Sequence, residues 1–96
     1  MSSTTLIHDN RLEILRIAKA NGATRDRIFG SFAHGTAGPD SDVDLLVDLE
    51  PSRHLFDIVA MGQDLEDFLG RPVHVVTEGA ISPYIRDEII REASPL

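Results

Sequence analysis

The sequence predicts a small α/β fold in which helices pack on a short mixed β-sheet. Apolar residues recur at helical spacing near the N-terminus, and the segment Val43–Leu49 has the continuous apolar character of a buried strand. Further strand and helix patterns then alternate to the C-terminus. Since no repeat, linker or low-complexity tract divides the 96 residues, we expect a single domain over residues 1–96.

The expected elements alternate in the order helix, strand, strand, helix, strand, helix. Their ranges are about 9–20, 27–29, Val43–Leu49, 52–69, 73–77 and 82–93. Residues 30–41 contain three glycines and a proline, which predicts a loop with at most one helical turn. Asn21-Gly22 and Gly70 are helix stops, whereas Ser52 and Ser82 are expected N-caps. The side chains expected to face inward are Leu12, Ile14, Leu15, Ile17 and Ala18; Leu55, Ile58, Val59, Leu65, Phe68 and Leu69; and Ile85, Ile89, Ile90 and Ala93.

Composition limits the location and the partners of the protein. The chain has no cysteine, so neither a disulfide framework nor a thiolate metal site is expected. It has no apolar run of about 18 residues, and residues 1–10 lack the apolar stretch of a signal peptide, so we expect a cytoplasmic location and no membrane contact. A formal net charge of −7 disfavours direct binding of nucleic acid. A nucleotide bound through divalent cations, a basic partner protein and a homo-oligomer all stay open.

The pair Gly30-Ser31, at the end of the strand expected over 27–29, is a candidate anion site. A glycine lets a phosphate approach the backbone because no Cβ stands in the way. Backbone N–H groups at the start of a helical turn favour an anion, and the Ser31 hydroxyl adds a donor. An isolated Gly-Ser pair is nevertheless more often an ordinary tight turn.

Asp42 and Asp44 make this interpretation more specific. Residues two apart on an extended chain point to the same side, about 6–7 Å from Cα to Cα. Two carboxylates at the mouth of a buried strand repel each other, and a divalent cation offsets that repulsion. Mg²⁺ prefers such oxygen ligands and completes its shell with water and substrate phosphates. A solvated acid pair is the usual alternative, but the buried Leu45-Leu46-Val47 that follows weakens it.

Two other nucleotide or metal motifs are excluded by spacing. Gly30 and Gly35 resemble the start of a Walker loop, but Thr36 stands where the lysine of that loop is required. The acids at positions 40, 42 and 44 resemble the start of an EF-hand. Leu45 and Pro51 occupy the positions where that loop needs glycine and glutamate.

The whole segment GSFAHGTAGPDSDVDLLV, residues 30–47, is similar to the signature of polymerase-β-type nucleotidyltransferases. It especially resembles the minimal nucleotidyltransferases (MNT proteins) that act as antitoxins beside HEPN-type toxins. The resemblance implies that Gly30 and Ser31 bind the triphosphate of ATP and that Asp42 and Asp44 are catalytic and hold Mg²⁺, possibly as two ions. It further implies transfer of AMP to a tyrosine hydroxyl of the partner toxin.

The chain departs from the family pattern at two positions. His74 replaces a third carboxylate on the later strand, and His34 replaces an arginine. A neutral imidazole can bind a metal or accept a proton, but it supplies no negative charge. Asp48 cannot take over the missing acid, because it lies four residues, or about 13 Å, beyond Asp44 along the strand.

Three functions therefore stay open at the level of sequence. The first is an active adenylyltransferase of the antitoxin type. The second is an inactive antitoxin that neutralises its partner by binding alone, because His74 weakens catalysis more than nucleotide binding. The third is a transferase for a small molecule, against which the short chain argues, since a separate acceptor pocket needs more protein.

Overall fold

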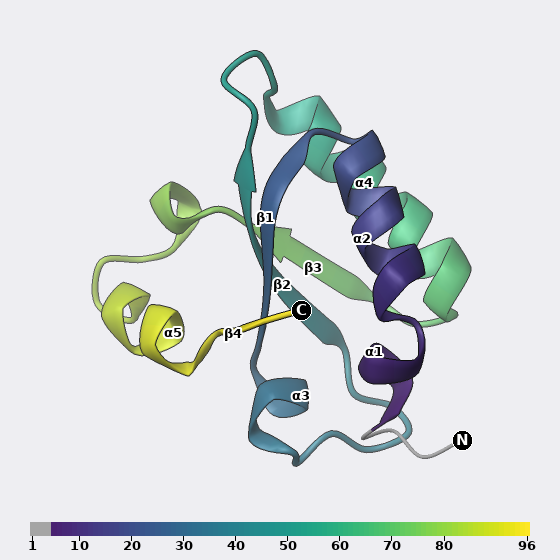
Figure 1. Ribbon diagram of the computed structural model, residues 1–96. Helices are drawn as coiled ribbons and strands as arrows, with labels where there is room; N and C mark the ends of the chain where they lie inside the picture. The colour runs from purple at the N-terminus through teal and green to yellow at the C-terminus, as the bar shows by residue number, and fades with distance from the viewer. Residues whose placement is uncertain (1–4) are drawn as a thin grey trace.

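The computed structural model describes residues 5–96 and has the predicted α/β class (Figure 1). The first four residues of the polar segment at positions 1–10 lie outside the described part. The elements, in chain order, are α1 (Leu6–Asp9), α2 (Arg11–Ala20), β1 (Ala23–Phe29), α3 (Ser31–His34), β2 (Val43–Leu49), α4 (Leu55–Leu69), β3 (Val73–Val76), the 3₁₀ helix η2 (Glu78–Ala80), α5 (Arg86–Glu92) and β4 (Ser94–Pro95).

The sheet has four strands in the order β3-β2-β1-β4. Strands β1 and β2 pair antiparallel and β2 and β3 pair parallel, so the sheet is mixed, as predicted. The two-residue strand β4 pairs antiparallel with β1 and was not predicted. A segment of two residues is too short to show the alternation on which a strand prediction depends.

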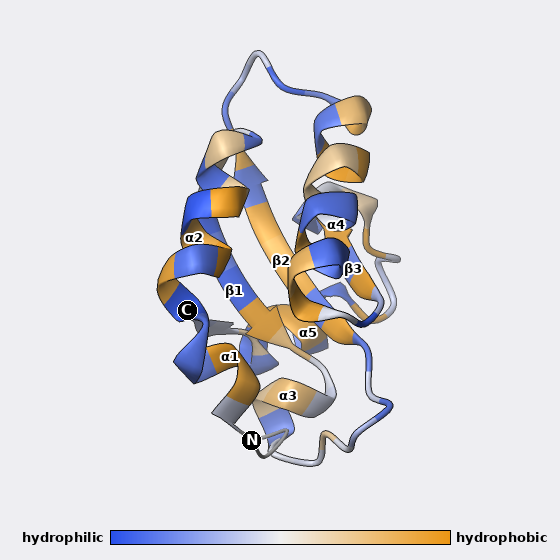
Figure 2. Ribbon diagram, turned by 90° about the vertical axis from the view of Figure 1, so that its right-hand side faces the viewer, coloured by the Kyte–Doolittle hydropathy of each residue, from blue (hydrophilic) through white to orange (hydrophobic). Residues whose placement is uncertain are grey.

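Helices cover both faces of this sheet, with α2 and α4 on one face and η2 and α5 on the other (Figure 1). In Figure 2 the apolar strand β2 is visible between α2 and α4, and the buried residues of both helices form one core with it. Alternate side chains of β2 form the centre of this core, because Val43, Leu45 and Val47 are fully buried. Leu46 is fully buried on the opposite face, where η2 contacts β2.

The helix predicted over 9–20 is α2, which begins at Arg11, and the short helix α1 that precedes it was not predicted. The Asn10 side chain donates a hydrogen bond to the carbonyl of Leu6, 2.8 Å away, and this bond competes with a continuous helix. Leu12, which was expected to face inward, is 73% exposed, whereas Ile14, Ile17 and Ala18 are buried as expected. The stop at Asn21-Gly22 is confirmed, because Asn21 is the C-cap of α2.

Helix α4 begins later than predicted, and fewer of its apolar residues are buried than the sequence predicted. Its N-cap is His54 rather than Ser52, and the His54 backbone N–H donates to Asp57 Oδ2 at 3.0 Å. Gly70 ends the helix at a φ of 71°, as predicted. The fully buried stripe is Met61 and Leu65 with Gly62 between them. Three residues expected to face inward are exposed, namely Leu55 (73%), Val59 (50%) and Phe68 (42%).

The remaining boundaries shift by a few residues. Helix α5 begins at Arg86 rather than after Ser82, because residues 83–85 form a turn in which the Arg86 N–H reaches the Ser82 carbonyl. Ile85 was expected to face inward but is 48% exposed, and Tyr84 is 98% exposed. Strand β1 extends back to Ala23, and β3 stops at Val76.

Candidate metal and nucleotide site

The turn between β1 and α3 is built on Gly30. Its φ of 72° and ψ of −150° lie in a region that is essentially reserved for glycine. A Cβ at this position would also collide with Oδ2 of Asp44. Both constraints make glycine necessary, and they show that the turn lies directly against one of the two predicted acids. Ser31 follows as the first residue of α3.

The register of the sheet brings the two acids and His74 together. Asp44 pairs with Phe29 on β1 and with His74 on β3. Asp42 stands just before β2, and its Oδ2 lies 2.9 Å from Nε2 of His74. Val43, between the two acids, is fully buried on the opposite face. Both carboxylates therefore face the same side, and the predicted residues Gly30, Asp42, Asp44 and His74 form one cluster.

The cluster concentrates negative charge. Burial raises the pKa of Asp44, and the charge of Asp42 raises it further, while His74 opposes the shift. The pKa of His74 is raised mainly by its hydrogen bond with Asp42, and the charge of Asp44 adds to this. In the folded chain, ionisation of Asp44 is therefore disfavoured by its burial and by the neighbouring charge of Asp42. A cation bound beside Asp44 would reverse that preference.

The loop between α3 and β2 is fixed by a short series of hydrogen bonds. Thr36 donates its backbone N–H to the Ser31 carbonyl at 3.0 Å. The N–H of Gly38 reaches Ser41 Oγ at 2.7 Å, which closes a turn before the acids. On the other side, Nη1 of Arg71 donates to the carbonyl of Ser41 at 3.1 Å. Arg71 was not predicted as a site residue, since a lone arginine after a helix stop forms no recognisable sequence pattern.

The donor set at the cluster fits magnesium. Within residues 5–96, no group of three or more His, Asp or Glu side chains converges to form a complete metal site. Two carboxylates are hard oxygen donors, and Mg²⁺ commonly uses one or two of them while phosphates and water supply its other ligands. Asp42 and Asp44 would therefore hold the ion together with the nucleotide, rather than form a closed protein cage.

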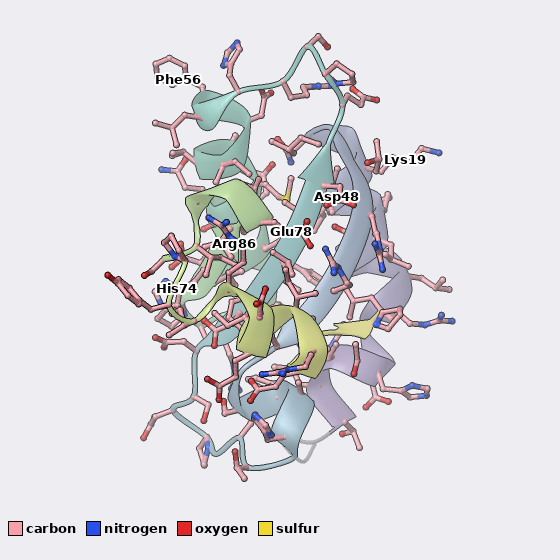
Figure 3. The ribbon with its side chains drawn as sticks, turned by 90° about the vertical axis from the view of Figure 1, so that its left-hand side faces the viewer. Lys19, Asp48, Phe56, His74, Glu78 and Arg86 are labelled. Carbon is pink, nitrogen blue, oxygen red and sulfur yellow. The ribbon has the colours of Figure 1, made fainter. Side chains whose placement is uncertain are left out.

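The other candidate residues have separate roles. His34 Nε2 lies 3.2 Å from Glu92 Oε2, so this histidine links α3 to α5. Asp48 lies 3.7 Å from Nη2 of the buried Arg27, and Figure 3 shows it well apart from His74. As expected, Asp48 does not replace the third carboxylate. Phe32, on α3, packs against the core and is partly buried.

Comparison with known proteins identifies the family. The model of the nucleotidyltransferase domain family matches residues 13–95. The chain belongs to the nucleotidyltransferase family. A protein of Methanocaldococcus jannaschii, provisionally named a protein adenylyltransferase, is 36% identical over 87 residues, which cover 91% of this chain and 94% of that protein. The prediction of an enzyme of the adenylyltransferase type is confirmed at this level.

Solved structures agree with the fold of this nucleotidyltransferase. One, provisionally described as a minimal nucleotidyltransferase, superposes with a TM-score of 0.86 at 40% identity, over 100% of this chain and 97% of the other. A toxin–antitoxin structure with AMP-PNP has a TM-score of 0.77 at 20% identity, over 90% and 71% of the two chains. At 20% identity, the similarity to the second structure shows the fold alone. The predicted minimal nucleotidyltransferase fold is confirmed.

None of the helices described for this nucleotidyltransferase in residues 5–96 is both long enough and apolar enough to cross a membrane.

Proposed function

We propose that this nucleotidyltransferase moves AMP from ATP to a tyrosine hydroxyl of a HEPN-type toxin and thereby acts as an antitoxin. The main observation behind the proposal is that the Gly30 turn lies against Asp44, which in turn lies close to Asp42. The name of the M. jannaschii relative supports protein adenylylation. The toxin–antitoxin structure with AMP-PNP supports an ATP-like donor and a toxin partner. Because ATP is the donor, the proposed activity belongs in the cytoplasm.

The residues of the site divide the work of the reaction. Glycine at position 30 lets the turn lie against the Asp44 carboxylate. The N–H groups of Ala33 and His34 donate to the Gly30 carbonyl, so those of Ser31 and Phe32 would be the ones to donate to a phosphate. Asp42 and Asp44 would hold Mg²⁺, which neutralises phosphate charge and favours attack at the α-phosphorus. The tyrosine oxygen forms a bond to that phosphorus, and the bond to the bridging oxygen of pyrophosphate breaks. The hydroxyl proton leaves, so the products are tyrosyl-AMP, pyrophosphate and a proton.

Transfer of radiolabel tests this proposal directly. The purified chain is incubated with Mg²⁺, ATP labelled at the α-phosphorus and a HEPN-type toxin, and the labelled residue is located by mass spectrometry. We expect label on a toxin tyrosine and a loss of at least about 100-fold in Asp44→Asn, since metal-held charge stabilisation is lost. Asp87→Asn, an exposed carboxylate on α5, makes the same charge change and should transfer normally. An unlabelled toxin with the wild-type chain would refute transfer.

The contact between His74 and Asp42 favours a second candidate, an antitoxin that works by binding alone. The imidazole occupies Oδ2 of Asp42 at 2.9 Å and supplies no negative charge of its own. His74→Asp separates the two candidates, because a third carboxylate should tighten Mg²⁺ binding and raise transfer about 10-fold or more. If wild type and His74→Asp both fail to transfer AMP but still neutralise the toxin, the binding-only function holds.

A further inference from the structure

Residues 71–74, which lead into β3, contact residues 41–43 at three successive points. Arg71 donates to the carbonyl of Ser41 at 3.1 Å. The carbonyl of Pro72 accepts the N–H of Val43 at 3.0 Å. His74 then contacts Asp42 at 2.9 Å. The positions of both acids relative to β3 are therefore set partly by bonds outside the regular ladder, and Arg71 makes the first of them.

Arg71 also reaches the other half of the site. Its guanidinium carbon lies 5.5 Å from the centroid of the Phe32 ring, which is cation–π distance. Phe32 follows Ser31 in α3, and Ser41 precedes Asp42. One side chain thus connects the turn that would take the triphosphate with the loop that carries the acids. Only Nε of this guanidinium is both buried and without a hydrogen-bond partner among the described residues.

The guanidinium suits this role better than an ammonium group. Its plane can lie over an aromatic ring while its edge donates to a carbonyl, whereas a lysine presents a compact charge on a flexible stem. The loop from Gly35 to Ser41 contains two glycines and a proline. Among the described residues, the hydrogen bonds given for this loop run within residues 31–41, apart from the one that Arg71 donates. Asp42 follows this loop and is repelled by Asp44 in β2, so without a fixed anchor the loop would relax outward.

We propose that Arg71 is a positioning residue that sets the separation between the Gly30-Ser31 turn and the acids at positions 42 and 44. Arg71 acts through Phe32 and Ser41 and needs no contact with the nucleotide. Its effect on AMP transfer rests on the proposed function. Its effect on the order of the loop does not.

The test compares Arg71→Ala with Arg71→Lys and Phe32→Leu. The alanine variant should weaken binding of Mg²⁺–AMP-PNP about 10-fold and lower kcat by about 10- to 100-fold, because a shift of about 1 Å in a reacting group has effects of that size. Arg71→Lys should recover the donor to Ser41 but not the stacked plane. Its nucleotide affinity and kcat should therefore fall between those of wild type and Arg71→Ala. Arg71 and Phe32 should be coupled, so that Arg71→Ala has a smaller effect in Phe32→Leu than in wild type. Arg91→Ala on α5 makes the same charge change at an exposed position and should leave binding and kcat unchanged.

Amide hydrogen exchange of the free protein provides a readout that needs neither nucleotide nor acceptor. In Arg71→Ala, exchange should accelerate about 10-fold in residues 31–42 and stay unchanged in β1 and α2. A merely stabilising role predicts a lower Tm and uniformly faster exchange, with unaltered nucleotide affinity and unaltered kcat; that result would overturn the proposal. If wild type binds Mg²⁺–AMP-PNP but transfers nothing, the proposed function fails while the role of Arg71 is still decided by affinity and exchange.

Discussion

Asp44 and Asp26 lie on neighbouring strands, and burial raises the pKa of both carboxyls. Asp44 belongs to the candidate site, where a bound cation would stabilise its charge. Asp26 has no such partner. Its Oδ1 is buried without a hydrogen bond among the described residues, and the nearby charge of Asp48 adds to the shift, so that its pKa is about 6. At neutral pH the ionised form of Asp26 therefore destabilises the folded chain.

We expect Asp26→Asn to stabilise the protein at pH 7 but not near pH 4. The folded pKa of about 6 is above the usual 3.8, so the folded state holds its proton longer than the unfolded state does. Below the unfolded value both states are protonated and no cost arises. The cost grows as pH rises and is complete above the folded value. Because Asp26 is partly solvated, we expect a gain of about 1 kcal/mol at pH 7.

Urea unfolding at the two pH values measures this gain. Asp87→Asn on α5 is the matched control, since it removes an exposed carboxylate. An equal gain for Asp26→Asn at both pH values would show that the benefit comes from packing or the unfolded state rather than from ionisation.

At the scale of elements, the short helix η2 is tied to the sheet through Arg27. This arginine, on β1, is 4% exposed, and its Nη2 lies 3.4 Å from Glu78 Oε1 and 3.7 Å from Asp48 Oδ1. Figure 3 shows Asp48 and Glu78 close together on this face. A buried guanidinium needs at least one such partner, because an unpaired buried charge is strongly unfavourable.

We expect Glu78→Gln to lower the free energy of unfolding by about 1 kcal/mol, since the partly exposed carboxylate is screened by water. In an Arg27→Met background the same change should have almost no effect, because the charge that needs Glu78 is gone. Arg27→Met alone should be nearly neutral, as methionine fills a similar volume beside Leu46 and the two acids remain solvated. Urea unfolding of the four proteins gives the coupling. Equal effects of Glu78→Gln in both backgrounds would contradict the pairing.

The elements also show which parts of the fold the sequence could predict. The central strand β2 and the stops at Asn21-Gly22 and Gly70 were predictable, because a continuous apolar run and the tolerance of glycine for positive φ are local properties. The inward face of α4 was not. Its apolar residues extend around more than one side, and the crossing over β3 decides which of them is covered, so Leu55 and Val59 stay exposed.

At the scale of the whole molecule, the acidic balance and the candidate site make the same prediction about Mg²⁺. The chain has a formal net charge of −7, and two of its acids lie at one strand mouth. A ligand that binds only the folded state stabilises it, by about 1.4 kcal/mol at ten times its Kd, which corresponds to a rise in Tm of about 6–11 °C.

Thermal unfolding in MgCl₂ should therefore show this rise for the wild type. NaCl at the same ionic strength screens the net charge equally and should give a smaller change. Asp44→Asn should respond alike to the two salts, because its site has lost a ligand. If wild type also responds alike to the two salts, Mg²⁺ acts only by screening and the metal site is absent.

The α/β class, the central strand and the combination of a glycine turn with two acids could be predicted from the sequence, because each depends on residues close together in the chain. The contact of His74 with Asp42, the bridge of Arg71 between Phe32 and Ser41, and the burial of Arg27 could not. These contacts join residues far apart in the chain. Whether such side chains meet depends on strand order, register and helix crossing, which no local pattern specifies.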